Sequence, residues 1–526
     1  MKLAIVLFAT VLSLPAQVSY DRLRQSDSDR GNWLTYSGSY NAQRYSHLNQ
    51  INAATVRRLR PLWVYQVHTT EPLEVSPIVA DGVMYLSEPG GSVSALDTLT
   101  GRPLWRYTRN IPKGVRGCCG QVNRGVAILG EMVYVGTFDA HLVALDIRSG
   151  IVRWDAEVAD PKLGHSITGA PLAIKDKIVV GIAGGEYGIR GFVDAYEAKT
   201  GRRAWRFWTV PAAGEKGSET WAGDSAKTGS ATTWVPGAYD PEENVVFWGT
   251  GNPGPDWNGD NRRGDNLYSD CLLALDGDTG KLKWYFQFTP HDLHDWDSTE
   301  VPVLAEAVVR GERRKVVLFA NRNAFYYVLD RASGQFLAGR AYTKQTWARG
   351  LDDSGRPVVL PDSAPSSEGA KVYPDVGGGT NWFSPSFSPQ TNLFYVSAQE
   401  EGGYYLKGDA EYKPGAQFNG GGIRPVPGEA HTGAIRALNP ATGELKWEFK
   451  LHSGAWAGVL STAGNLVFGS SNEGDFYALD AAAGRLLWRF QTGGGINANP
   501  VTYLSNGKQQ VAIASGNSIF VFGLEE

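Results

Sequence analysis

Cysteine and long apolar stretches are what this 526-residue sequence has least of. It contains three cysteines and no Cys-x-x-Cys-His segment, which excludes a covalently attached c-type haem on this chain. After the first residues, no apolar run is long enough for a membrane-spanning helix, so we expect no stable membrane insertion. An excess of charge is also absent, because the net charge is −4 without long runs of either sign. Neither a nucleic-acid partner nor an anionic membrane surface is therefore indicated.

The first residues have the pattern of a secretory signal. Lys2 supplies a positive charge, and the apolar run Leu3–Leu14 that follows is too short to cross a bilayer. We predict a signal peptide over residues 1–17, with cleavage near Ala16, and one mature domain over residues 18–526. A buried N-terminal helix is the alternative. The signal predicts a soluble protein that is exported to the periplasm or secreted.

Glycine and tryptophan are abundant, with 64 and 17 residues, and both belong to a repeat. The pattern Ala-Leu-Asp-x-x-x-Gly-x-x-x-Trp recurs with small variations. A degenerate copy at Asp330 lacks the tryptophan, and a partial copy ends at Trp63, which makes eight copies. The turn positions of the other six copies are Asp97, Asp146, Glu197, Asp276, Asn439 and Asp480.

Each copy predicts a strand, a tight Asp–Gly turn and a second strand that begins near the tryptophan. Further β-rich runs lie upstream of most copies, so each unit supplies three or four antiparallel strands. We therefore predict an all-β, eight-bladed β-propeller in which the tryptophans dock one blade on the next. Gly- and Pro-rich insertions are expected at about 210–270 and 341–430. A β-sandwich array and an open solenoid are the alternatives.

Two of the three cysteines, Cys118 and Cys119, are neighbours in the sequence. Adjacent Cα atoms lie about 3.8 Å apart across a trans peptide. Ordinary disulfides prefer roughly 4.4–6.8 Å, so a bond between neighbours forms a strained ring. An oxidising compartment would favour that bond, and two buried thiols are the alternative. Cys271 lies in a strand-like apolar run and is expected in the core.

The segment that begins at Cys118-Cys119 resembles the vicinal-disulfide motif of the pyrroloquinoline quinone (PQQ)-dependent methanol and ethanol dehydrogenases. The resemblance extends through almost the whole mature chain, and several motifs in the same order make it specific. They are Trp33-Leu-Thr-Tyr, Gln43-Arg-Tyr-Ser, Gly185-Glu186-Tyr-Gly, Gly249-Thr-Gly-Asn252-Pro-Gly-Pro, Gly264-Asp-Asn-Leu-Tyr, Thr289-Pro-His-Asp-Leu-His-Asp-Trp-Asp297 and Asn381-Trp.

The resemblance implies a metal site formed by Glu186, Asn252 and Asp295. All three carry oxygen donors, which suit a hard cation. Asp297 lies two residues beyond Asp295, so on an extended segment both carboxylates face one ion. An acid at this second position is similar to the pattern of the lanthanide-dependent members, whereas calcium enzymes usually have a small neutral residue there. The alternative is that Asp297 caps the following Ser-Thr turn.

The resemblance also implies a site for PQQ, a flat quinone with three carboxylates. Arg124, Thr168 and Arg322 match positions that bond its carboxylates or its reactive carbonyl. Trp234 matches the aromatic floor of the site, and the Cys118–Cys119 ring would cover the opposite face.

Other positions that match the lining of the cofactor pocket are Glu74, Asn381 and Trp456. Where many members carry Ser-x-Ala before the ligand Glu, this chain has Ala183 followed by Gly184 and Gly185. The change removes a hydroxyl, and the backbone N–H groups of the two glycines are expected to replace its hydrogen bond.

The activity implied by the resemblance is oxidation of a primary alcohol to an aldehyde. Asp295 would accept the hydroxyl proton, and Arg322 would stabilise the developing oxyanion. A soluble c-type cytochrome is the expected electron acceptor, and a homodimer is compatible with the resemblance. A quinoprotein that acts on sugars or polyols is one alternative, and a non-catalytic propeller scaffold is the other.

Overall fold

A computed structural model describes residues 18–525, and almost all of their regular structure is β-strand. The predicted signal peptide, residues 1–17, lies outside the described residues. None of the described helices is long and apolar enough to cross a lipid bilayer. Besides one α-helix, the helical elements are short 3-10 turns: α1 (Tyr20–Arg24), η1 (Val56–Arg58), η2 (Pro89–Gly91), η3 (Pro161–Leu163), η4 (Gly185–Tyr187), η5 (Ser218–Thr220), η6 (Ser225–Thr228) and η7 (Pro361–Ser363).

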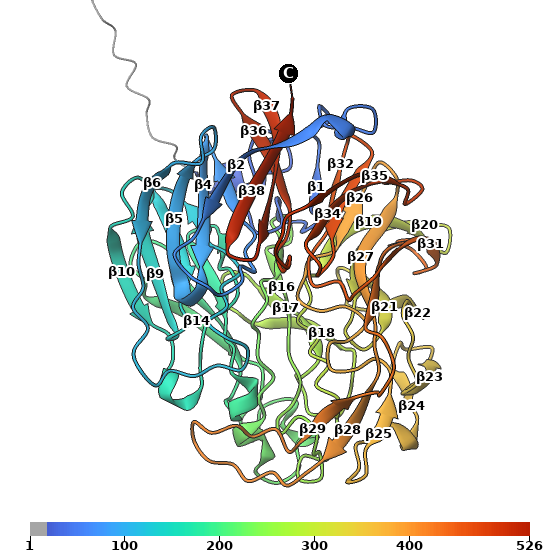
Figure 1. The fold of residues 1–526 in the computed structure, drawn as a ribbon. Coiled ribbons are helices and arrows are strands. Elements are labelled where there is room, and N and C mark those ends of the chain that lie inside the picture. The colour runs from blue at the N-terminus through green and yellow to red at the C-terminus, as the bar shows by residue number, and fades with distance from the viewer. Residues whose placement is uncertain (1–17, 526) are drawn as a thin grey trace, which may run out of the picture.

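Eight sheets of four or five strands follow one another in the described part of the chain (Figure 1). The first five are antiparallel meanders of consecutive strands. They are β3 (Ile78–Ala80), β4 (Val83–Glu88), β5 (Ser92–Asp97) and β6 (Pro103–Tyr107); β7 (Ala127–Leu129), β8 (Met132–Gly136), β9 (His141–Asp146) and β10 (Val152–Glu157); β11 (Leu172–Ile174), β12 (Lys177–Gly181), β13 (Phe192–Glu197) and β14 (Arg203–Trp208); β15 (Ala238–Asp240), β16 (Val245–Gly249), β17 (Cys271–Asp276) and β18 (Leu282–Gln287); and β19 (Val303–Val309), β20 (Glu312–Ala320), β21 (Phe325–Asp330) and β22 (Phe336–Ala341).

The last three sheets draw strands from distant parts of the chain. The strands are β26 (Ser386–Ser388), β27 (Leu393–Glu400), β30 (Thr432–Leu438) and β31 (Leu445–Leu451); β1 (Tyr45–Ser46), β32 (Leu460–Thr462), β33 (Leu466–Ser470), β34 (Asp475–Asp480) and β35 (Leu486–Gln491); and β2 (Leu59–Gln66), β36 (Val501–Ser505), β37 (Lys508–Ser515) and β38 (Ser518–Leu524). In the final sheet β2 pairs antiparallel with β38, and Figure 1 shows this blue strand beside the red one. The N-terminal part of the chain thus completes the C-terminal sheet.

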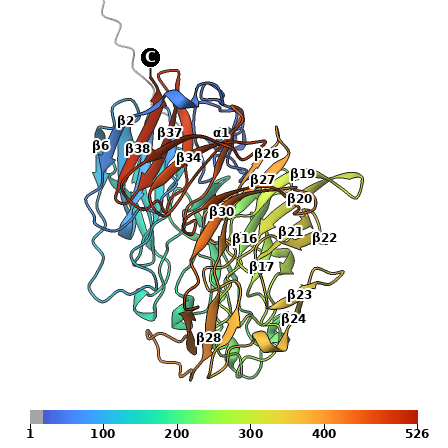
Figure 2. The ribbon, with the colours of Figure 1, turned by 45° about the vertical axis from the view of Figure 1, so that its right-hand side comes forward.

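The second predicted insertion forms two small sheets of its own. They consist of β23 (Ala348–Leu351) and β24 (Pro357–Val359), and of β25 (Ala370–Val372), β28 (Gly403–Lys407) and β29 (Gly421–Pro425). In both ribbon views they lie together at the lower end of the molecule, away from the chain's C-terminus (Figures 1 and 2).

The repeated turn has a local cause that Asp97 and Gly101 illustrate. The Asp97 carboxylate accepts hydrogen bonds from the backbone N–H groups of Leu99 and Thr100. Gly101 has a φ of +71°, a conformation that favours glycine, and its N–H donates to the Asp97 carbonyl at 2.8 Å. The same geometry leaves room for the Trp63 ring, which would lie 2.6 Å from a Cβ at Gly101.

Aromatic side chains connect neighbouring sheets at these turns. The Trp63 indole N–H donates to the Thr98 carbonyl at 3.0 Å, and Trp105 donates to Ile147 at the same distance. In the degenerate copy, Tyr326 from β21 takes this role and donates to the Pro440 carbonyl. The missing tryptophan is therefore replaced by a tyrosine from a different strand.

Candidate active site

One cavity of about 380 Å³ is lined by all fifteen residues that the sequence predicted for the site. A larger hollow of about 580 Å³ lies between β14 and β18 and contains none of them. The fifteen residues are Glu74, Cys118, Cys119, Arg124, Thr168, Gly184, Gly185, Glu186, Trp234, Asn252, Asp295, Asp297, Arg322, Asn381 and Trp456. Lining residues that sequence reasoning did not single out include Phe138, Thr232, Asp375 and Asn497, and Trp382 of the Asn381-Trp motif also lines the cavity.

A tight turn presents Asp295 and Asp297 to the cavity. The Asp292 carboxylate accepts hydrogen bonds from the backbone N–H groups of His294, at 2.9 Å, and Trp296, at 2.7 Å. The His294 and Trp296 rings stack with centroids 4.3 Å apart. Asp295 has a φ of +60°, so the segment is not the extended strand that the sequence suggested. The two carboxylates reach the same cavity from a turn instead.

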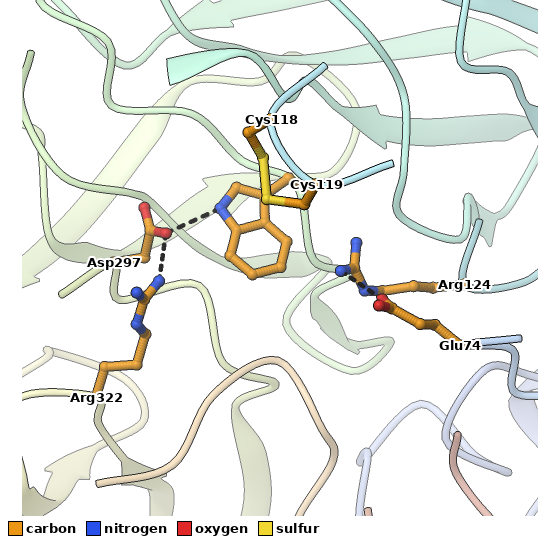
Figure 3. The surroundings of a disulfide bond; sticks show 7 residues. Glu74, Cys118, Cys119, Arg124, Asp297 and Arg322 are labelled. Carbon is orange, nitrogen blue, oxygen red and sulfur yellow. Dashed lines mark hydrogen bonds and ion pairs between the residues drawn. A yellow bond between two sulfur atoms is a disulfide. The ribbon is translucent and has the colours of Figure 1, made fainter. Parts of the chain in front are cut away.

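Asp297 is the most heavily bonded carboxylate of the site (Figure 3). Its Oδ2 accepts from Arg322 Nη1 at 2.6 Å and from Trp234 Nε1 at 3.2 Å, and its Oδ1 accepts from the backbone N–H of Asn252 at 3.0 Å. No hydrogen bond found among residues 18–525 joins Asp297 to Ser298 or Thr299. The bonds of Asp297 are thus directed to the cavity wall rather than to the following turn.

Asp256 is a further acid of this site that the sequence reasoning missed. It is buried, and its Oδ1 accepts from the side-chain amide of Asn252 at 2.8 Å. This bond fixes which way the Asn252 amide points. Asp256 directly follows the quoted Gly249–Pro255 motif, so its sequence position was the available signal.

The carboxylates in and directly behind the wall of the cavity disfavour one another's charged forms. Burial and the nearby charge of Asp297 raise the pKa of Glu186 to about 7. Burial and the charge of Asp256 hold the pKa of Asp295 well above its usual range. Arg322 faces these acids, and Asp297 and Asp295 raise the pKa of its guanidinium against the opposing effect of burial. One guanidinium among four acids leaves an excess of negative charge, which a bound cation would neutralise.

The donor set fits a hard metal ion. Glu186, Asn252, Asp295 and Asp297 offer oxygen atoms only, as calcium and similar ions require. Glu186 also lies beside the disulfide, with one carboxylate oxygen and both sulfur atoms within 4.8 Å of one another. Because the sulfurs are bonded to each other, they carry no thiolate that would compete as a ligand.

Arg124 provides the second cationic group of the cavity. Its guanidinium pairs with Glu74 at 2.7 Å and lies over the rings of Trp234 and Trp382, at 4.8 and 4.6 Å from their centroids. Its backbone N–H donates to the Thr168 carbonyl at 3.0 Å. In Figure 3, Arg124 and Glu74 lie on one side of the disulfide, and Asp297 and Arg322 lie on the other.

Unpartnered donors in the cavity fit an anionic cofactor. The Nε atoms of Arg124 and Arg322 are buried without a hydrogen-bond partner among the described residues. Such donors cost free energy unless a ligand satisfies them. A flat molecule with several carboxylates, such as PQQ, would satisfy both.

The three cysteines have the states that the sequence predicted, the disulfide from the resemblance and the buried thiol from its apolar run. Cys118 and Cys119 are joined by a disulfide, with a Cα–Cα distance of 3.8 Å, and both are exposed. Cys271 is buried in β17 as a free cysteine, as expected of a core residue.

The remaining predicted residues shape the wall of the cavity. Gly184 has a φ of +119°, and a Cβ there would lie 2.2 Å from the Gly164 carbonyl oxygen, so only glycine fits at this position. The Asn381 amide is fixed by a bond to the Gly377 carbonyl and by one from the Trp382 N–H. Trp456 packs on Phe383 at a centroid distance of 6.0 Å.

The sequence and the fold of this chain are both similar to those of one group of known proteins. Residues 33–340 match the family described as glucose/ethanol/alcohol dehydrogenase, beta-propeller domain, and residues 431–522 match that of the outer membrane protein assembly factor BamB. The quinoprotein alcohol dehydrogenase PedH of Pseudomonas putida is 39% identical over 95% of this chain and 89% of its own length. The quinohemoprotein alcohol dehydrogenase ADH IIB of the same species is 39% identical over 98% of this chain and 77% of its own.

Solved structures resemble the whole fold. The quinohemoprotein alcohol dehydrogenase of Comamonas testosteroni superposes with a TM-score of 0.92 at 34% identity, over 96% of this chain and 82% of its own. A europium-containing methanol dehydrogenase gives 0.90 at 31% identity, over 96% of this chain and all of its own. The chain therefore belongs to the family of PQQ-dependent alcohol dehydrogenases.

Proposed function

We propose that this protein oxidises small primary alcohols to aldehydes with PQQ and a metal ion bound in the 380 Å³ cavity. The observation that carries the proposal is the meeting of two chemically different halves in one cavity. The oxygen donors of Glu186, Asn252, Asp295 and Asp297 line the same cavity as Arg322, which is bonded to Asp297. Arg124, which lies over two tryptophan rings, lines it as well.

Each half has a distinct task. When bound, PQQ supplies a quinone carbonyl that takes two electrons from the alcohol carbon, and the ion makes that carbonyl more electrophilic. Glu186, Asn252, Asp295 and Asp297 hold the ion, and Arg124, with Thr168 and the backbone at Gly184 and Gly185, binds the carboxylates. Trp234 and the Cys118–Cys119 disulfide enclose the ring between them.

Asp295 takes the proton of the substrate hydroxyl, because it is the acid of the turn that exposes part of its side chain to the cavity. A carboxylate that touches a cation is a weak base, so the proton leaves together with, or after, the electrons. Arg322 is held by Asp297 and the Val376 carbonyl, and its fixed guanidinium stabilises the oxyanion that develops.

Asp297 favours a lanthanide over calcium as the ion. A third carboxylate in the ligand set raises the repulsion among the ligands, and a trivalent ion offsets that repulsion better than a divalent one.

The eight sheets suggest a single propeller over residues 18–526 with eight blades, docked by the tryptophan contacts and closed by the β2–β38 pairing. We further infer export by the segment 1–17 and transfer of electrons to a soluble c-type cytochrome, since no haem-attachment segment occurs in this chain.

The proposal is tested by reconstituting the protein with PQQ and either Ca²⁺ or La³⁺ and assaying dye-linked oxidation of primary alcohols, polyols and sugars. Small primary alcohols should be oxidised best, and Asp295→Asn should bind PQQ but lose most of the activity. Preference for polyols or sugars would reassign the substrate class. PQQ uptake is measured by absorbance, and a protein that takes up no PQQ would favour the alternative of a non-catalytic scaffold.

A further inference from the structure

Asp375 lies in the wall of the cavity although no motif pointed to it. It belongs to the segment between β25 and β26, and this segment contacts the residues of the site. Trp296 Nε1 donates to the Asp375 carbonyl at 2.9 Å, and Arg322 Nη2 donates to the neighbouring Val376 carbonyl at 2.6 Å. Asp375 is thus fixed to the same frame as the proposed base, but no contact found among residues 18–525 places it among the metal ligands.

Polar side chains lead from Asp375 toward solvent. Asp375 Oδ1 accepts from the Gly377 N–H at 2.9 Å. A Cβ at Gly377 would lie 3.1 Å from that oxygen and 3.6 Å from Gln399 Oε1, so both side chains border the small space beside this glycine. Gln399 Oε1 lies 2.7 Å from His431 Nε2, and His431 Nδ1 lies 3.0 Å from Glu401 Oε2. The His431 and Glu401 side chains are 31% and 26% exposed, so the series ends at the surface.

Gln399 can serve His431 in two protonation states. In the observed arrangement both ring nitrogens of His431 face oxygen atoms, which the doubly protonated ring satisfies. If the Gln399 amide turns over, its Nε2 donates to His431 Nε2, and the neutral ring is satisfied as well. That Nε2 is buried and has no other partner among the described residues. The amide is therefore free to follow the proton on the ring.

Burial shifts the pKa values of the ionisable groups in the series, and it also raises the pKa of Glu401. Burial and repulsion by Glu401 raise the pKa of Asp375 to about 6, while His431 and Arg322 oppose this shift. Burial lowers the pKa of His431, and the charge of Asp375 opposes it. The Tyr405 hydroxyl donates to the carbonyl of Pro374, the residue before Asp375. Burial raises the pKa of this phenol so far that it stays protonated and exchanges no proton with Asp375.

We propose that Asp375, Gln399, His431 and Glu401 form an exit path for protons from the cavity to solvent. The inference rests on the proposed function, in which each alcohol yields an aldehyde, two electrons for the acceptor and two protons. A proton leaves Asp295 for cavity water and then binds the Asp375 carboxylate. Water that enters the space beside Gly377 takes the proton from Asp375 and protonates His431, which gives a proton to Glu401 or to a solvent base. Only O–H and N–H bonds break and form along this path.

The test compares Asp375→Asn with Asp409→Asn, which removes an exposed carboxylate elsewhere. In dilute buffer at pH 7, kcat of the PQQ- and metal-loaded Asp375→Asn enzyme should fall about 10- to 100-fold with little change in KM. Added imidazole should restore most of the loss, because a diffusing base replaces the missing carboxylate. Asp409→Asn should match the wild type throughout. A slow Asp375→Asn enzyme that no buffer restores would show a structural role and overturn the path.

A second variant and a measurement without cofactor make the test independent of folding and loading. Gly377→Ala keeps every acid but fills the space between Asp375 and Gln399, and it should show the same buffer-dependent loss. In the cofactor-free protein, NMR titration of His431 should give a lower pKa in Asp375→Asn than in the wild type, because a favourable charge is lost. Unchanged rates in both variants, or an unchanged His431 titration, refute the path alone. A wild type that oxidises no alcohol refutes the proposed function and the path with it.

Discussion

Replacing Asp297 by asparagine separates the charge of this side chain from its shape. The amide keeps an oxygen for the Asn252 N–H or the Trp234 indole, whose distances to the carboxylate are 3.0 and 3.2 Å. What disappears is one negative charge beside Arg322 and beside the proposed ion. The variant therefore tests whether that charge selects the ion.

The magnitude follows from the charge of the ion. Two unit charges about 4 Å apart at an effective dielectric constant of about 20 interact with about 4 kcal/mol. Loss of the carboxylate thus costs a divalent ion about 8 kcal/mol and a trivalent ion about 12 kcal/mol. The relief of repulsion among the remaining acids is the same for both ions and cancels in the comparison. La³⁺ should lose about 4 kcal/mol more than Ca²⁺, or about three orders of magnitude in relative affinity.

The assay is chelator-competition titration of both ions into wild type and Asp297→Asn, followed by tryptophan fluorescence, with Asp409→Asn as the charge control. The ratio of La³⁺ to Ca²⁺ affinity should fall in Asp297→Asn and stay constant in the control. An equal loss for both ions, or a ratio that does not change, would show that Asp297 supports Arg322 without selecting the metal.

Three further predictions follow from the geometry. Gly484→Ala should lower the free energy of unfolding by about 2–5 kcal/mol, because φ is +69° and the new Cβ would lie 2.5 Å from the Trp447 ring. The control Gly507→Ala, at φ +75° with nothing within 4 Å, should lose only the part that backbone strain contributes. Equal losses of stability for the two variants in thermal melts would contradict a role of the Trp447 contact. The pKa of Glu186 is raised to about 7 from 4.5, so its stabilising contribution is present below pH 4.5 and is lost as the pH rises through 7. The free energy of unfolding of the metal-free protein should therefore fall by about 3 kcal/mol over that pH range. Glu186→Gln or added La³⁺ should reduce this pH dependence, and thermal melts of the wild type that do not change with pH would rule the effect out. Arg124→Gln should weaken PQQ binding at least about tenfold in an absorbance titration, and undiminished binding would remove Arg124 from the site.

The site was more predictable from the sequence than the contacts that shape it. Residues such as Glu186, Asn252 and Asp295 stand inside short motifs, and the order of those motifs identified them. Asp375 and Val376 line the same cavity, but they reach it through the course of a long insertion, which no local pattern specifies. Asp295 reaches the cavity from a positive-φ turn held by Asp292, a conformation that aspartate adopts more readily than most residues but that the spacing of two acids does not reveal.

The repeat predicted where strands and turns lie because each turn is encoded locally by Asp and Gly. Contacts between sheets depend on how the side chains of two sheets fit together, and the repeat within one sheet does not specify that fit. Tyr326 replaces a missing tryptophan from a strand in which nothing marked it as a contact residue. The parallel addition of β1 to the sheet of β32–β35 also joins segments about 400 residues apart, and no turn signal can encode such a pair.

The pairing of β2 with β38 also governs when the molecule can become complete. Leu59 lies opposite Leu524, so the strand made early must wait for nearly the entire chain before it finds its partner. Pairing of strands so far apart in the sequence slows folding, because the chain loses the entropy of a long loop before the contacts between the two strands can stabilise it. Until then, β2 has an unpaired edge that other chains can join. A circular permutant that links the two ends and opens a surface turn elsewhere would turn this last long-range step into a local hairpin and should fold faster than the natural chain.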